Sequence, residues 1–153
     1  MEKRSNFKTE SRQQQSDAAR VATEVRPIVS KDSDWSLVTG KKKQMTRGDW
    51  IREKRAITRI TKKAVRAMYP GYAVSVRSGR GTAHHWVYID VTMPELNDEK
   101  VRNTSREWEY KDVCRRIEDT LLALGIKYGI YESDCGPNSS PSPCLLVSVN
   151  HAF

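Results

Sequence analysis

Apolar side chains recur with a helical period in the stretch that follows residue 46. They stand three, four or seven positions apart and would share one face of a helix, at Trp50, Ile57, Ile60, Ala64 and Met68. Thr46 followed by Asp49 forms a loose capping box, which is typical of a helix start. Tyr69-Pro70-Gly71 interrupts the pattern, because proline and glycine both end helices. The spacing therefore predicts a helix between about residues 46 and 68.

A period of two follows this helix and predicts two strands. Apolar residues occupy alternate positions in each strand, first at Tyr72, Val74 and Val76 and then at Val87, Ile89 and Val91. Ser78-Gly79-Arg80-Gly81 between them predicts a turn, and Met93-Pro94 ends the second strand, which begins at Trp86.

The same order of elements recurs in the C-terminal half. A helix is predicted from Arg106 to Leu124, with Gly125 as its stop and an apolar face at Val113, Ile117, Leu121 and Leu124. A strand from 126 to 131, a polar loop over 134–143 and a last strand from 145 to 149 follow.

Two helix-hairpin halves in sequence predict an α+β fold. Each hairpin has an apolar face to cover and each helix has one to offer, so an αββαββ domain over residues 46–153 is expected. Its sheet would be four-stranded and mainly antiparallel, with both helices on one face. Residues 1–45 are polar and predict a flexible N-terminal arm. A few apolar residues of this arm could dock on the domain as a short strand or clip, namely Val25, Ile28, Val29, Trp35, Leu37 and Val38.

Positive charge is concentrated in one part of the chain. The net charge is +8, but residues 41–80 alone hold thirteen Lys and Arg against two Asp and Glu. Residues 1–40 are close to neutral, and residues 81–153 carry a net −4. A segregated charge of this kind builds a local positive field that attracts polyanions.

Within this segment the cations also follow a helical period. They fall roughly opposite the apolar face of the first predicted helix, which has no acid after Glu53 to pair with them. A solvated charged face and an acidic protein partner are the alternatives. A membrane surface is disfavoured, because the apolar face is needed for the core. The expected phosphate-binding residues are Lys41, Lys42 and Lys43, then Arg52, Arg55, Arg59, Lys62, Lys63 and Arg66 on the helix, with Arg77 and Arg80 in the next hairpin.

Two aromatic residues add a second kind of contact. Trp86 and Tyr88 lie on the strand face opposite Val87 and Ile89, so they could stack on unpaired bases or pack against the N-terminal arm.

Metal-binding and catalytic patterns are weak in this chain. A zinc site could be formed by Cys135, Cys144 and His151, but the sequence has no Cys-x-x-Cys or His-x-x-x-His pair to support it. We therefore expect reduced thiols and no metal or other cofactor. Cys135 and Cys144 could also face each other across their loop. No nucleophile with a base, no paired carboxylates and no phosphate-cradling loop emerge, and we expect no enzymatic activity. The N-terminus lacks a signal peptide pattern and no apolar run is long enough for a membrane span, which favours the cytoplasm.

The stretch from Ile57 to Pro94 resembles a known family. It combines a basic helix, the stop Pro70-Gly71, the strand Val74-Ser75-Val76-Arg77, the turn Ser78-Gly79 and the strand Val87-Tyr88-Ile89-Asp90-Val91 before the terminal proline. This order is similar to that of a large-polyvalent-protein-associated domain of phages and conjugative elements. The resemblance implies an accessory protein of a mobile element that acts on nucleic acid or on host defence systems.

We therefore expect a non-enzymatic nucleic-acid-binding protein, with RNA and DNA both possible as partners. The alternative is a protein–protein inhibitor or adaptor with anti-defence activity, whose basic face meets an acidic or nucleoprotein partner.

Overall fold

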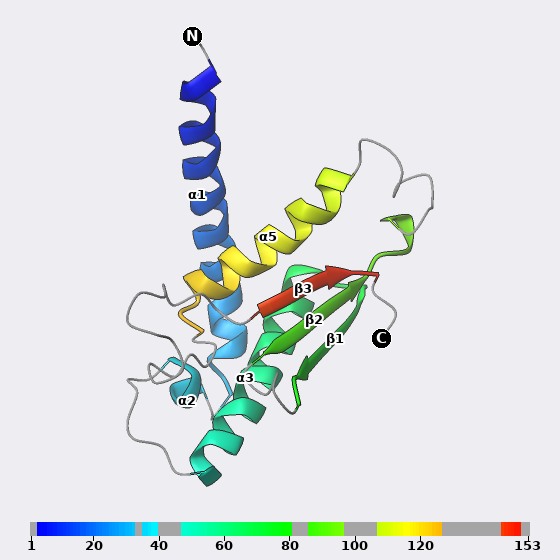
Figure 1. Cartoon of the computed structure of the whole chain (residues 1–153). Coiled ribbons are helices and arrows are strands. Elements are labelled where there is room, and N and C mark those ends of the chain that lie inside the picture. Colours follow the sequence, from blue (N-terminus) through cyan, green and yellow to red (C-terminus); the bar gives the residue numbers. More distant parts are fainter. Residues whose placement is uncertain are drawn as a thin grey trace, which may run out of the picture.

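The computed structural model describes residues 3–32, 35–39, 47–80, 86–96, 107–126 and 145–150. Five helical segments and three strands lie within these ranges (Figure 1). Their bounds are α1 Lys3–Val29, α2 Trp35–Thr39, α3 Arg47–Met68, β1 Ala73–Ser78, β2 Val87–Thr92, the short 3-10 helix η2 Pro94–Leu96, α5 Glu107–Ala123 and β3 Leu145–Val149.

The two main predicted helices and the first predicted hairpin are confirmed. α3 ends at Met68 and α5 ends at Ala123, each just before a glycine with a positive φ. Gly71 has φ +88° and Gly125 has φ +74°, a backbone conformation that side chains with a Cβ rarely adopt. The Gly79 amide donates to the Trp86 carbonyl at 2.8 Å, which closes the hairpin between β1 and β2.

The sheet of the described residues differs from the predicted one. Its order is β1-β2-β3, with β1 antiparallel to β2 and β3 parallel to β2, so it is three-stranded and mixed instead of four-stranded and mainly antiparallel. The physical reason lies in the connection: α5 returns the chain across the sheet, and such a crossover joins parallel strands. Of the strand predicted over 126–131, only the buried Ile126 belongs to the described residues.

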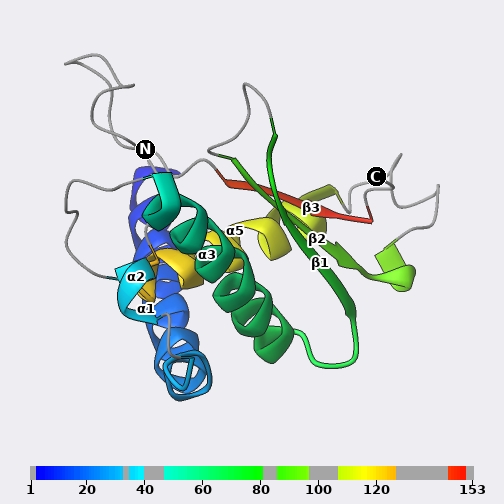
Figure 2. The same cartoon turned by 90° about the horizontal axis from the view of Figure 1, so that it is seen from below.

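Both main helices cover one face of the sheet, as the sequence predicts. Val74, Ile89 and Val149 point from the three strands into the core. Ile60 of α3 and Ile117 of α5 meet them there, completely buried. We call this side of the sheet the inner face and the opposite side the outer face. Figure 2 shows the sheet on one side of α3 and α5, with α1 on the other side.

The prediction of a flexible arm over residues 1–45 needs correction. α1 packs against α3 and α5, and Ala22, Val25 and Val29 of α1 are buried in the core, as is Val38 of α2. The apolar residues recur at spacings of three and four and cover the otherwise open side of the two helices. The apolar residues of this segment predict a short strand or clip, whereas the structure has the helices α1 and α2 there. The first turns of α1 extend beyond the rest of the fold (Figure 1).

Asn150 joins the end of β3 to the end of β2. The Met93 amide donates to its side-chain oxygen at 2.6 Å, and its side-chain nitrogen donates to the Met93 carbonyl at 2.7 Å. Its backbone amide donates to the Val91 carbonyl at 3.0 Å. The residue adopts φ +58°, which asparagine tolerates better than most side chains. Asn150 therefore reinforces the parallel pairing of β3 with β2 at its C-terminal end.

Candidate nucleic-acid interface

The cations of α3 gather on one face of that helix. At about 100° per residue they fall within an arc about 100° wide, on the side away from Ile60 and Ala64. All are exposed except the half-buried Lys62. We call this set the basic stripe: Arg52, Arg55, Arg59, Lys62, Lys63 and Arg66.

One acid neutralises part of the basic stripe. Arg59 Nε and Nη2 donate to the two carboxylate oxygens of Asp32 at 2.8 and 3.2 Å, and Lys63 Nζ lies 3.5 Å from Oδ2. The Asp32 side chain is only 7% exposed, so the carboxylate depends on these cations. Sequence reasoning missed this acid, because it lies in the segment that was predicted to be unpacked and no local spacing links it to α3.

Three other members of the stripe have no side-chain partner within the described part of the chain. For Arg55, Lys62 and Arg66 no side-chain hydrogen bond or ion pair occurs there, and Arg52 on the same face is exposed. The stretch from Arg52 to Arg66 is about 21 Å long at the rise of an α-helix. These residues give α3 a positively charged face.

The predicted hairpin and aromatic residues lie on a different surface. Arg77 and Tyr88 are cross-strand partners on the outer face, and the Arg77 guanidinium carbon lies 5.4 Å from the centroid of the Tyr88 ring. Trp86 is half-buried just before β2. The structure therefore divides the predicted site into the basic stripe on α3 and a cation–aromatic contact on the sheet.

Lys54 connects these two surfaces at the hairpin. Its Nζ donates to the Gly79 carbonyl at 2.8 Å, next to the exposed Arg80. Burial and the charge of Arg80 lower the pKa of Lys54 from its ordinary value. The sequence contains no signal for this residue, because it lies outside the arc of the basic stripe, about 80° around the helix from Lys62.

Several predicted residues lie outside the described part of the chain. Lys41, Lys42 and Lys43 are among them, and so are the three residues that were considered as a zinc site, Cys135, Cys144 and His151. Where side chains are described, no group of three or more His, Cys, Asp or Glu residues could hold a metal ion. Over the same residues, no helix is both long and apolar enough to pass through a bilayer.

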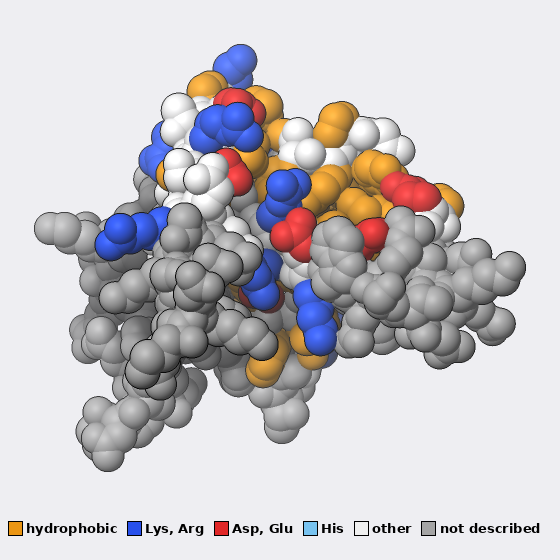
Figure 3. All heavy atoms as spheres, turned by 90° about the horizontal axis from the view of Figure 1, so that it is seen from above, with side chains coloured by type: hydrophobic (Ala, Val, Ile, Leu, Met, Phe, Trp, Pro, Cys, Tyr) orange, Lys and Arg blue, Asp and Glu red, His pale blue; other side chains and the backbone are white. Residues whose placement is uncertain are grey.

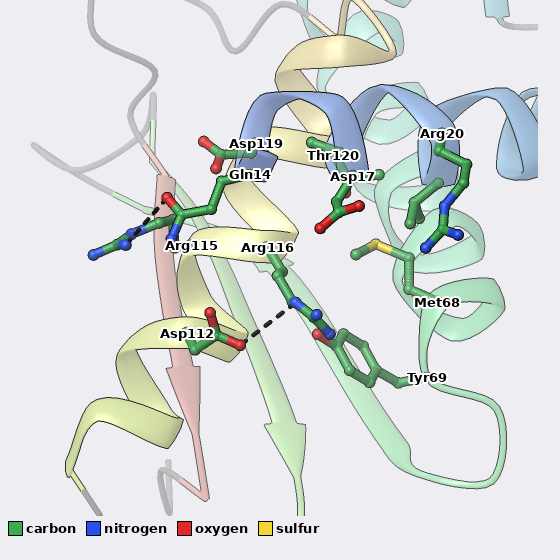
Figure 4. Close-up of a pocket in the computed structure, with 12 residues that line it drawn as sticks. Gln14, Asp17, Arg20, Met68, Tyr69, Asp112, Arg115, Arg116, Asp119 and Thr120 are labelled. Atoms are coloured by element: carbon green, nitrogen blue, oxygen red, sulfur yellow. Dashed lines mark hydrogen bonds and ion pairs between the residues drawn. The ribbon is translucent and has the colours of Figure 1, made fainter. Parts of the chain in front are cut away.

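A cavity of about 170 Å³ lies between α1, α5 and the end of α3 (Figure 4). Its charges are mixed: Arg116 pairs with Asp112 at 3.4 Å, Arg115 donates to Gln14 at 3.3 Å, and Asp17 is nearby. Seen along α1 from its N-terminal end, Lys and Arg side chains also lie beside Asp and Glu (Figure 3). This side of the molecule is therefore less suited to a polyanion than α3 is.

The fold and the basic stripe define an α+β protein with a cationic helix. Comparisons with protein-family models, curated proteins and solved structures gave no match to the chain. The chemistry of the interface therefore follows from its own residues.

Proposed function

We propose that this chain is a non-enzymatic protein that binds nucleic acid through phosphate contacts on α3. One observation carries the proposal: Arg55, Lys62 and Arg66 lie on one face of α3, and none of the three forms an ion pair with an acid of the described residues. Ordinary surface helices alternate both signs of charge. A surface of one sign attracts a polyanion and repels other cations.

The dimensions of the stripe suit a phosphate backbone. One strand of duplex DNA carries a phosphate about every 3.4 Å, so a stripe of about 21 Å runs beside about six of them. Binding releases condensed counterions, which supplies affinity without any reading of sequence. The proposal is therefore for general binding to RNA or DNA, with phosphates as the common ligand.

The stripe is tested by reversing its charge. The triple variant Arg55→Glu, Lys62→Glu and Arg66→Glu should weaken binding to a fluorescent oligonucleotide about 100-fold or more at about 0.15 M salt. The matched control is Arg12→Glu, Arg20→Glu and Arg115→Glu, which makes the same change of net charge on exposed positions of α1 and α5. The control should change affinity about threefold or less, because distant charges are screened. Equal effects of the two variants would contradict a specific role for α3.

A protein partner is the second candidate, and one residue favours it. Ile51 is 38% exposed one turn before Arg55, and an apolar side chain beside a basic stripe suits an acidic protein surface with an apolar centre. An adaptor or inhibitor acting on a host nucleoprotein complex would use this surface. A pull-down that survives nuclease treatment and is lost on Ile51→Ser would favour this function over direct nucleic-acid binding. The origin in a phage or another mobile element rests on the resemblance over residues 57–94 alone.

A further inference from the structure

Three residues form a row across the outer face of the sheet. The strand register places Arg77 of β1 opposite Tyr88 of β2, and Tyr88 opposite Leu146 of β3. Arg77 is exposed, Tyr88 is half-buried and Leu146 is 46% exposed. The row thus presents a guanidinium that lies over an aromatic ring, with an aliphatic side chain next to the ring, on the face that α3 and α5 leave uncovered (Figure 2).

Charge is unevenly distributed along this sheet. The hairpin end, where β1 ends and β2 begins, carries Arg77, Arg80 and Lys54. At the opposite end, Tyr72 donates its hydroxyl hydrogen to the exposed Glu95. Asp90, one row further from the hairpin, is only 6% exposed and accepts a hydrogen bond from Ser148 Oγ at 3.1 Å. A polyanion on the outer face is therefore favoured at the hairpin end.

We propose that the row Arg77–Tyr88–Leu146 binds unpaired bases, so that the nucleic acid held by this protein is single-stranded. Bases in a duplex are stacked on one another and cannot lie flat on a sheet, whereas unpaired bases stack on aromatic rings and guanidinium planes. The phosphates of the same strand would pass Arg80 and Lys54, which lead from the hairpin to α3. The inference rests on the proposed function for its phosphate contacts, but its base contacts use different residues.

The test compares single-stranded and duplex probes on the full chain. Fluorescein-labelled oligothymidine and oligouridine of about 20 nucleotides, longer than the site of one small domain, serve as single strands. A duplex of equal length is the comparison. Tyr88→Ala should weaken single-strand binding by about 5- to 150-fold, the usual range for one lost stacking partner. Tyr88→Phe keeps the ring and should bind as the unmodified chain does, and duplex binding should be the same for all three proteins.

Two further measurements separate stacking from a loss of structure. Arg77→Ala removes an exposed side chain and its contact with the Tyr88 ring, so it should weaken single-strand binding while lowering the melting temperature only slightly. Replacing a central base of the probe with 2-aminopurine should give fluorescence quenching on binding that Tyr88→Ala abolishes. Thr92→Ala, an exposed change at the far end of β2, is the control.

The outcomes distinguish this inference from the proposed function. If single-strand affinity is unchanged in folded Tyr88→Ala and Arg77→Ala while the α3 reversal abolishes binding, base stacking is excluded and the phosphate contacts stand. If the α3 reversal has no effect but Tyr88→Ala weakens binding, the sheet binds the strand and the role of α3 is wrong. Binding of an acidic peptide that matches the oligonucleotide in strength and depends equally on Tyr88 would overturn the assignment of bases.

Discussion

Arg59 holds the carboxylate of Asp32 through two hydrogen bonds, 2.8 and 3.2 Å long, and so joins the turn after α1 to the middle of α3. Two parallel bonds from one guanidinium to one carboxylate fix the relative orientation of both groups. An arginine that the sequence assigns to phosphate binding therefore has a structural partner. The cations available to an external phosphate are chiefly those further from Asp32.

Removing this pair should reduce stability more than removing another stripe residue. We expect Arg59→Ala to lower the free energy of unfolding by about 1–2 kcal/mol. This value is at the lower end for hydrogen bonds between charged groups, because the Arg59 side chain is 48% exposed and solvent screens its charge. Arg66→Ala should change it by about 0.5 kcal/mol or less, as is usual for exposed positions. Urea unfolding followed by circular dichroism measures both. A loss in Arg66→Ala as large as that in Arg59→Ala would contradict the structural role of the pair.

Substitution of Asn150 should lower the stability of the fold more than substitution of any other residue at the C-terminal end of β3. Asn150→Ala removes two hydrogen bonds to the Met93 backbone. It also places alanine at φ +58°, where its side chain can make no polar contact that would offset the unfavourable backbone conformation. Together these losses should cost about 2–4 kcal/mol. Asn150→Gly loses the same bonds but tolerates the backbone, so it should be about 1 kcal/mol more stable than the alanine variant. Thermal unfolding of the three proteins gives the comparison, and equal stability of the Ala and Gly variants would exclude the backbone contribution.

The part of the fold that sequence predicted well is the part with local signals. α3 and α5 have apolar residues at helical spacing and positive-φ glycines after their ends, and β1 and β2 have valine or isoleucine at every second position. These features act over a few residues, so they can be read without knowing the partner.

The remaining fold depends on contacts between distant residues. α1 has only small apolar residues such as Ala18 and Ala22 at several buried positions, and the polar sequence around them favoured an unpacked arm. They become buried because α3 and α5 together offer a surface for them to cover. The parallel pairing of β3 with β2 likewise has no local signal, because it depends on where α5 returns the chain.

The candidate site shows the same division. The grouping of cations on α3 was predictable, because one helix fixes their relative positions. The sequence could not show that Arg59 pairs with an acid whereas Arg66 does not. The acid, Asp32, is far from both arginines in the sequence. The separation of Arg77 and Tyr88 from the stripe follows from β1 and β2 exposing the face opposite to α3.

Cys114 should react slowly with alkylating reagents near neutral pH. Burial, together with the negative charge of Glu118, raises the pKa of the Cys114 thiol from 9.0 to about 11. Two pH units mean about 100-fold less thiolate, which is the reactive form, at any pH below 9. Iodoacetamide rates measured against pH in a Cys135→Ser, Cys144→Ser protein should rise with a midpoint well above that of a cysteine in the urea-unfolded chain. Glu118→Gln should lower the midpoint, and a midpoint equal to the unfolded value would show that the thiol is not buried.

The slope of log affinity against log salt should report how many phosphates the basic stripe contacts. Each neutralised phosphate contributes about −0.7 to the slope of log affinity against log salt for a single strand and about −0.9 for a duplex. Three contacts, from Arg55, Lys62 and Arg66, should therefore contribute about −2 to the slope for a single strand. Arg66→Gln removes one positive charge without introducing a negative one, so it should make the slope less steep by about 0.7. Tyr88→Ala removes no charge, so it should lower affinity equally at all salt concentrations and leave the slope unchanged. Titrations between about 50 and 200 mM salt resolve these differences. A slope near zero in the unmodified chain, or one that Arg66→Gln leaves unaltered, would mean that the phosphates are not held by α3.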